Sequence, residues 1–109
     1  MGVWAVCLDS YFYIIGEENM VDYWLEIERY PNYEINTKGQ VRNIKTGIIL
    51  KPQTNVAYGR RRVKLNGKYE YVDKLMVENF FDVKGKTNYK IIHLDGNIMN
   101  NDLDNLLVN

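Results

Sequence analysis

The sequence of 109 residues contains a single cysteine, Cys7, and a single histidine, His93. One cysteine excludes a disulfide within the chain and a zinc site built from several thiolates, so we expect a reducing compartment. The longest apolar runs, Val3–Leu8 and Tyr11–Ile15, are far shorter than the roughly 20 residues that a helix needs to cross a bilayer. No basic leader precedes them, as a secretory signal would require. We therefore expect an intracellular protein that is not secreted and has no membrane segment.

Acidic side chains are absent between Lys38 and Lys68, a segment that carries nine Lys or Arg. Residues 1–37 contain one Arg and seven acids, and residues 69–109 contain four Lys and seven acids, so the whole chain has a net charge of zero. A block of unopposed positive charge inside a neutral protein favours an anionic partner, above all the phosphates of nucleic acid. The alternative is a solvated surface patch. We expect the block to contact double-stranded DNA.

The spacing of apolar and turn residues predicts an α+β fold, with small antiparallel sheets or hairpins followed by a short helix. Two apolar runs within residues 1–20 predict one or two short strands. The strongest turn signal is Asn66-Gly67, because a type I′ hairpin requires positive φ at both central positions. Beyond residue 20 we expect strands at Tyr33–Asn36, Val41–Ile44, Ile48–Leu50, Tyr58–Leu65, Lys68–Val72 and Tyr89–Leu94.

Alternation along the strand Tyr58–Leu65 predicts one cationic face and one mostly apolar face, since successive side chains of a strand point to opposite sides. The cationic face would carry Arg60, Arg62 and Lys64, and the other face Arg61, Val63 and Leu65. A ribbon of this kind can present cations to a DNA groove while its other side packs on a core.

A short helix is expected over Lys74–Phe81, with Asp73 as its N-cap. Four apolar residues of this helix pair one turn apart, and we assign them to the core, not to a site. They are Met76, Val77, Phe80 and Phe81.

Two motifs identify a family. The first comprises Trp24 and Ile27, Tyr30-Pro31-Asn32-Tyr33-Glu34-Ile35-Asn36, Gly39-Gln40-Val41-Arg42, and Gly47-Ile48-Ile49-Leu50-Lys51-Pro52-Gln53. The second comprises Val72–Phe80 and the segment IIHLDGNIMNNDLDN, residues 91–105. Together they resemble phage and bacterial HNH homing endonucleases that carry the fourth type of nuclease-associated modular DNA-binding motif, NUMOD. The resemblance implies an N-terminal extension at residues 1–20, a NUMOD-like β-rich module at 21–72 and a partial HNH-like module at 73–109, within one compact unit.

In this family a ββα unit surrounds a divalent metal, and the resemblance implies that His93 is the general base that takes a proton from water. Asn105 would brace the loop and orient the site, with Asn100 and Asn101 fixing the turn. Asp95 is the weak candidate for a metal ligand. From the residues alone, an alternative remains: a lone histidine in an apolar strand is often simply packed and hydrogen-bonded.

The sequence departs from the family pattern in three respects. Ile92 stands where the family has a metal-binding Asp or Asn, and Asp73 stands where it has a histidine. The sequence ends at Asn109, before the helix that carries the second ligand in the family. We therefore expect weak nuclease activity or none, with Mg²⁺ or Mn²⁺ as cofactor only if the protein is active.

The leading hypothesis is a DNA-binding protein derived from an HNH homing endonuclease. One alternative is an active metal-dependent nicking endonuclease that uses His93. Another is a virus-encoded protein-binding module or inhibitor, in which residues 1–19 would bind a partner or pair two copies. The candidate DNA-binding residues are Arg42, Lys45, Lys51, Arg60, Arg61, Arg62, Lys64 and Lys68.

Overall fold

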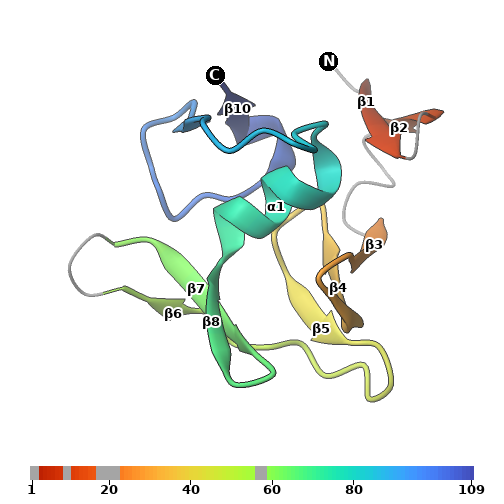
Figure 1. The fold of residues 1–109 in the computed structure, drawn as a ribbon, viewed down its shortest axis with the longest axis vertical. Coiled ribbons are helices and arrows are strands. Elements are labelled where there is room, and N and C mark those ends of the chain that lie inside the picture. Colours follow the sequence, from red (N-terminus) through yellow and green to blue (C-terminus); the bar gives the residue numbers. More distant parts are fainter. Residues whose placement is uncertain (1–2, 9–10, 17–22, 56–58) are drawn as a thin grey trace.

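The computed structural model describes residues 3–8, 11–16, 23–55 and 59–109, the first two ranges by their backbone alone. Within these residues, one α-helix accompanies four small antiparallel sheets, which confirms the α+β prediction (Figure 1). The first sheet consists of β1 (Val3–Leu8) and β2 (Tyr11–Gly16), paired antiparallel. The strands predicted in residues 1–20 are therefore present, and the residues between them lie outside the described part.

The second sheet has the order β3–β4–β5, formed by Trp24–Ile27, Tyr30–Asn36 and Val41–Asn43. The strand predicted at Ile48–Leu50 is wrong, since only Ile49 forms a bridge, to Arg42. The side chain of Asn43 accepts hydrogen bonds from the backbone N–H groups of Lys45 and Thr46, which curls the chain immediately after β5. The returning segment consequently meets β5 over too short a stretch to extend the sheet.

The third sheet has the order β6–β7–β8, formed by Gln53–Thr54, Arg61–Leu65 and Lys68–Tyr71. Asn66 and Gly67 close the β7–β8 hairpin at φ of 51° and 83°, which confirms the predicted turn. Val63 and Leu65 are buried while Lys64 is exposed, as the alternation predicted. The strand begins at Arg61, later than predicted, and Tyr58, the first residue of the predicted range, lies outside the described part.

Helix α1 (Val72–Phe80) begins directly after β8, two residues earlier than predicted, and ends one residue earlier. The prediction that Asp73 caps it is wrong, because the N-cap is Tyr71 and makes no side-chain hydrogen bond. Asp73 lies in the first turn instead, buried and paired with Arg60. The carboxylate that the local sequence assigned to the helix end thus forms a long-range ion pair instead.

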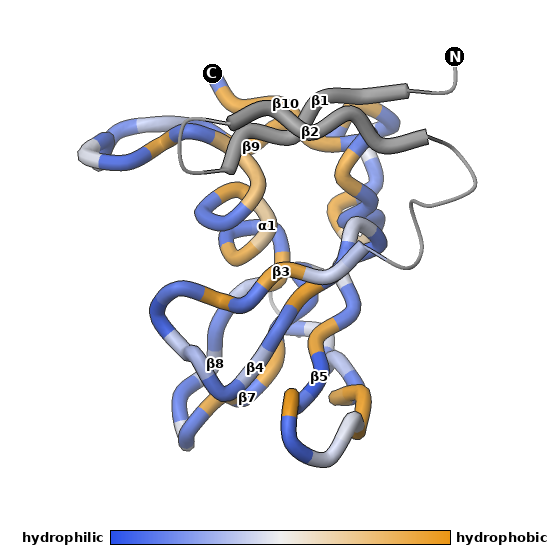
Figure 2. The backbone as a smooth tube through the Cα atoms, turned by 90° about the vertical axis from the view of Figure 1, so that its right-hand side faces the viewer, coloured by the Kyte–Doolittle hydropathy of each residue, from blue (hydrophilic) through white to orange (hydrophobic). Residues whose placement is uncertain are grey.

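The core lies between α1 and the strands around it. Figures 1 and 2 show α1 with β9 and β10 on one side and the β3–β5 and β6–β8 sheets on the other. The predicted core residues Met76, Val77 and Phe80 are buried, and Phe81 packs partly buried against the same cluster. The core cluster comprises Ile27, Tyr30, Ile35, Val41, Val63, Leu65, Val72, Leu75, Met76, Phe80, Leu103 and Leu106.

The last sheet pairs β9 (Ile91–His93) with β10 (Leu106–Val108), and a 3-10 turn at Leu103–Asn105 precedes β10. β9 is shorter than the strand predicted at Tyr89–Leu94. No helix among the described residues has the length and apolar character needed to span a membrane.

The turn after β4 is joined to the loop before β10. The N–H of Leu103 donates a hydrogen bond of 2.9 Å to the carbonyl of Thr37. Gly39 adopts φ of +83°, and a Cβ placed there would lie 3.1 Å from Asn101 Cβ and 3.3 Å from Val72 Cγ1. Glycine is therefore required at this position both by its backbone conformation and by the close approach of the C-terminal loop.

Candidate functional site

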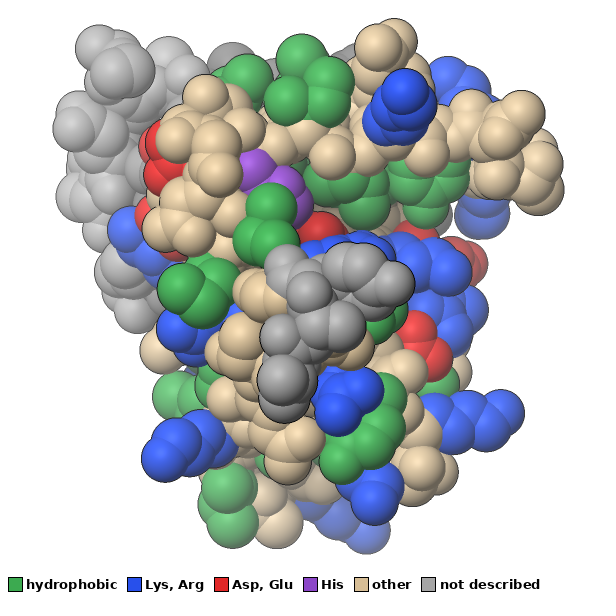
Figure 3. All heavy atoms as spheres, turned by 90° about the vertical axis from the view of Figure 1, so that its left-hand side faces the viewer, with side chains coloured by type: hydrophobic (Ala, Val, Ile, Leu, Met, Phe, Trp, Pro, Cys, Tyr) green, Lys and Arg blue, Asp and Glu red, His purple; other side chains and the backbone are tan. Residues whose placement is uncertain are grey.

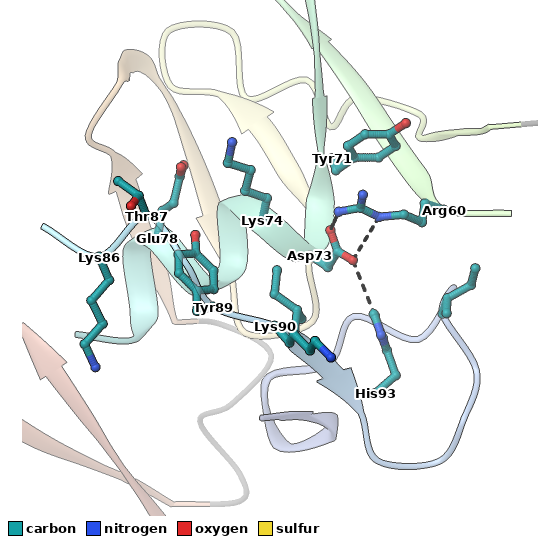
Figure 4. Close-up of a pocket in the computed structure, with 12 residues that line it drawn as sticks. Arg60, Tyr71, Asp73, Lys74, Glu78, Lys86, Thr87, Tyr89, Lys90 and His93 are labelled. Atoms are coloured by element: carbon teal, nitrogen blue, oxygen red, sulfur yellow. Dashed lines mark hydrogen bonds and ion pairs between the residues drawn. The ribbon is translucent and has the colours of Figure 1, made fainter. Parts of the chain in front are cut away.

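The single histidine lies at the end of β9, with its ring turned into the protein. The His93 side chain is 6% exposed, and its Nε2 lies 3.8 Å from Asp73 Oδ2 (Figure 4). The same nitrogen lies 3.2 Å from Asn101 Oδ1. The sequence predicted a role for Asn101 in the turn, but the proximity of Asp73 was not foreseen, because the two residues belong to different elements.

Arg60 holds both oxygens of the Asp73 carboxylate, including the Oδ2 atom that faces His93. Its Nη2 lies 2.6 Å from Asp73 Oδ1 and its Nε lies 3.2 Å from Oδ2. The guanidinium also stacks over the Tyr71 ring, 3.8 Å from the ring centroid. Two hydrogen bonds and a ring contact fix the position of Arg60, and the Asp73 side chain they hold is 6% exposed. Arg60, Asp73 and His93 thus form one charged cluster that connects the start of β7, α1 and β9.

The loop between β9 and β10 is held by amide and carboxylate side chains. Asn105 accepts a hydrogen bond from the Asp95 N–H and donates to Asp95 Oδ1 and to the Asn100 carbonyl. Asp95 also accepts from Asn100 Nδ2 and from the Asn97 N–H. These bonds, the one from Asn100 first, lower the pKa of Asp95 below its usual value, because they stabilise the carboxylate. The loop from Leu94 to Asn105 is therefore held in its conformation by side-chain hydrogen bonds.

A divalent metal, as the family resemblance implies, does not fit the donor groups in the described residues. No cluster of three or more His, Cys, Asp or Glu side chains occurs among them. Ile92, next to His93, offers only an aliphatic side chain, and both Asp73 oxygens accept hydrogen bonds from Arg60. Asp95 is engaged by its own loop. The described residues around His93 therefore do not form a site for a divalent metal.

A cleft of about 1080 Å³ opens in front of the charged cluster. Arg60, Asp73 and His93 line it together with Lys74, Lys86 and Lys90 (Figure 4). The three lysines were not among the predicted DNA-binding residues, because they lie outside the cationic block and are scattered along the sequence. No local pattern could have grouped them; only the fold brings them to one cleft.

The eight predicted DNA-binding residues fall into two groups. Arg42 is paired with Glu34 and stacks 3.8 Å over the Trp24 ring, and Arg60 is paired with Asp73. The other six form no ion pair with a described acid. They are Lys45, Lys51, Arg61, Arg62, Lys64 and Lys68.

Two of the unpaired cations, the half-buried Arg62 and the exposed Lys64, share the outer face of the β7–β8 hairpin. Arg62 lies 4.0 Å over the Tyr69 ring, and Lys64 Nζ lies 5.4 Å from the same ring centroid. Figure 3 shows Lys and Arg side chains (blue) spread over one face of the molecule, with the histidine (purple) above most of them. This face combines positive charge with an aromatic ring, which limits the freedom of the Arg62 guanidinium.

Comparison with known proteins gives three findings. Residues 22–66 match the NUMOD4 motif. The chain is similar to an uncharacterized HNH endonuclease of Acanthamoeba polyphaga mimivirus, with 35% identity over 89 residues that cover 80% of this chain and 27% of the viral protein. It is also similar to a solved structure that concerns DNA binding and cleavage by the HNH homing endonuclease I-HmuI. There the TM-score is 0.68 at 30% identity, over 80% of this chain and 52% of the other. The chain thus spans about a quarter and about half of these two relatives.

Proposed function

Because the chain carries a NUMOD4 motif and is related to HNH homing endonucleases over four fifths of its length, we propose that it binds double-stranded DNA through the β7–β8 hairpin. The observation that carries this proposal is the outer hairpin face with the exposed Lys64 and the half-buried Arg62, cations that form no ion pair with a described acid. Its charge is therefore available to phosphates.

The hairpin has the shape and the support that this role requires. A two-stranded ribbon fits the major groove of B-DNA, and Arg or Lys on its outer face can reach phosphates or guanine. Val63 and Leu65 anchor the inner face in the core, so the outer face is presented on a rigid base. Lys68, exposed beside the turn, extends the cationic surface to the tip of the hairpin.

Arg42 and Arg60 have a different role in this proposal. Each is held by a carboxylate and by an aromatic ring, so its charge is already balanced within the protein. We assign them to the framework that shapes the surface. Lys45 and Lys51, exposed on the segment after β5, complete the DNA-binding surface with the hairpin residues.

We further infer that the described residues by themselves support little or no cleavage. The donor groups beside His93 do not form a metal site, and the carboxylates nearest to it are committed to other partners. The nicking alternative rests on His93 alone. The partner-binding role expected for residues 1–19 stays a prediction, since the structure describes none of the side chains of this segment.

The test is binding of the full chain to duplex DNA, measured by fluorescence anisotropy across a salt series. Each phosphate contact contributes about 0.9 to the slope of log affinity against log salt concentration. The double variant Arg62→Ala/Lys64→Ala should lower the slope by up to about 1.8 and weaken binding at low salt. Equal slopes for variant and wild type would show that the hairpin is not part of the DNA interface.

Lys84→Ala is the matched control for the single variant Lys64→Ala. Both lysines are exposed and both substitutions remove one positive charge, but Lys84 lies outside the hairpin and is near Glu28. An effect of overall charge alone would lower the slope equally in both. The proposal expects a lower slope only for Lys64→Ala.

A further inference from the structure

We propose that Asp73 is a positioning residue for His93: with Asn101 it fixes the imidazole proton on Nε2 and leaves Nδ1 as the nitrogen that can accept a proton. This role belongs to the residue that stands where the family pattern has a histidine. It is independent of DNA binding by the hairpin.

The geometry at Nε2 selects one tautomer. This nitrogen faces the Asn101 side chain at 3.2 Å and the Asp73 carboxylate at 3.8 Å. An asparagine can present either its carbonyl oxygen or its amide group, so Asn101 alone would accept either tautomer. A carboxylate only accepts, and it repels the lone pair of a bare nitrogen. Asp73 therefore decides that Nε2 carries the proton and that Asn101 presents its oxygen.

Arg60 makes this arrangement durable. A carboxylate that is 6% exposed would be costly to bury as an anion without a partner. The two hydrogen bonds from Arg60 pair the carboxylate of Asp73 with a cation and fix its plane. Arg60 thus acts on His93 only through Asp73, as the chain of dashed contacts in Figure 4 shows.

The other ring nitrogen is free to act. No described residue donates a hydrogen bond to Nδ1 of His93 or accepts one from it. His93 lines the cleft together with Lys74, Lys90 and Glu78. A neutral imidazole with its proton locked on Nε2 has its lone pair on Nδ1, the state that a proton acceptor requires. The cluster thus prepares His93 as a base, whereas simple packing would place no demand on its tautomer.

The test is nuclear magnetic resonance of the full chain labelled with ¹⁵N, in alkaline buffer where imidazole is neutral. His93 is the single histidine, so the spectrum contains the signals of one imidazole and they can be assigned to His93 directly. Long-range ¹H–¹⁵N correlation distinguishes the two tautomers. We expect the Nε2–H form alone, with an N–H proton that exchanges slowly enough to be observed. A mixture of tautomers, or the Nδ1–H form, would refute the proposal.

Asp73→Ala separates positioning from packing. Without the carboxylate, we expect the Nδ1–H form to appear and the exchange of the imidazole proton to become several-fold faster. Asp102→Asn is the control, because its carboxylate lies next to Asn101 in sequence but faces Lys38 at 3.6 Å. It should leave the imidazole spectrum unchanged. An unaltered tautomer in Asp73→Ala would show that Asp73 does not position the ring.

A second pair of variants covers the case in which Asp73→Ala fails to fold because Arg60 loses its anion. Arg60→Gln/Asp73→Ala removes both charges, a change that proteins tolerate better than the loss of one partner. It should show the same mixture of tautomers. Arg60→Gln alone retains Asp73 and should keep the Nε2–H form even if its free energy of unfolding is lower. If Arg60→Gln mixed the tautomers as fully as Asp73→Ala, the role would be structural and the proposal wrong.

Discussion

The connections that close the β7–β8 and β9–β10 hairpins are stabilised in different ways. The first is closed by two residues, Asn66 and Gly67, whose backbone angles alone fit the turn. The second is closed by a loop from Leu94 to Asn105, which is held by hydrogen bonds among Asp and Asn side chains. One hairpin depends on local conformation and the other on contacts between residues up to ten positions apart.

This difference matches what each hairpin contributes. The β7–β8 hairpin offers surface charge, and its proposed effect on DNA binding is graded, because each cation adds its own share. The β9–β10 hairpin offers the position of one ring, which depends on several contacts at once. In the first hairpin, the effects of substitutions on DNA binding should therefore add up. In the second hairpin, a single substitution should already disturb the position of the ring.

The largest effect is expected for Asn105→Ala. The side chain makes three hydrogen bonds in a site that is 7% exposed, and its loss leaves Asp95 and Asn100 groups without their partner. The free energy of unfolding should fall by about 2–3 kcal/mol. Urea denaturation measures this change. Asp104→Ala, an exposed neighbour, is the control, and equal stability of the two variants would contradict the side-chain origin of the loop.

A smaller effect is expected for Gly67→Ala. At φ of 83° a Cβ is strained whatever the surrounding space, and nothing lies within 4 Å that would add a clash. The cost should be about 1–2 kcal/mol, from backbone conformation alone. Thermal or urea unfolding measures it, with Lys68→Ala as the adjacent control. A cost as high as that of Asn105→Ala would mean that the two turns are not as different as proposed.

The smallest expected effect is a loss of stability at acidic pH. Arg29, by its hydrogen bonds, lowers the pKa of Glu70 in β8, and Asn100 leads the groups that lower the pKa of Asp95. A lowered folded-state pKa gives stability that is present above the unfolded pKa and is lost as pH falls through the folded value. Stability should therefore decline in acid.

Glu70→Gln and Asp95→Asn should each flatten part of this acid decline. High salt should weaken the Glu70 part more, because Arg29 is 43% exposed and its charge is screened, whereas the Asp95 bonds come from neutral groups. Urea titrations at several pH values and two salt concentrations measure both parts. Equal salt sensitivity would refute the distinction.

Sequence reasoning succeeded where the cause was local. The Asn66-Gly67 turn, the alternation of Val63 and Leu65 and the core residues of α1 follow from neighbours within a few positions. The motifs also gave the lineage, which the NUMOD4 match and the relatives confirm.

It failed where a distant residue decided the outcome. Asp73 reads as a helix cap until the fold brings Arg60 and His93 to it. Likewise, nothing in the sequence shows that Arg42 and Arg60 are neutralised by Glu34 and Asp73 while Arg62 and Lys64 are not. The charge of a segment can be counted from the sequence, but its availability depends on the tertiary structure.

The close approach at Gly39 bears on how such proteins can be recombined. The turn at Thr37–Gly39 packs against Asn101, with no room for a side chain at Gly39. The N–H of Leu103 is hydrogen-bonded to the carbonyl of Thr37 in the same turn. A NUMOD4 segment moved alone onto a foreign nuclease would leave this surface bare. A chimera should therefore contain the loop at residues 101–103 as well as residues 22–66, so that the two contacting segments are transferred together.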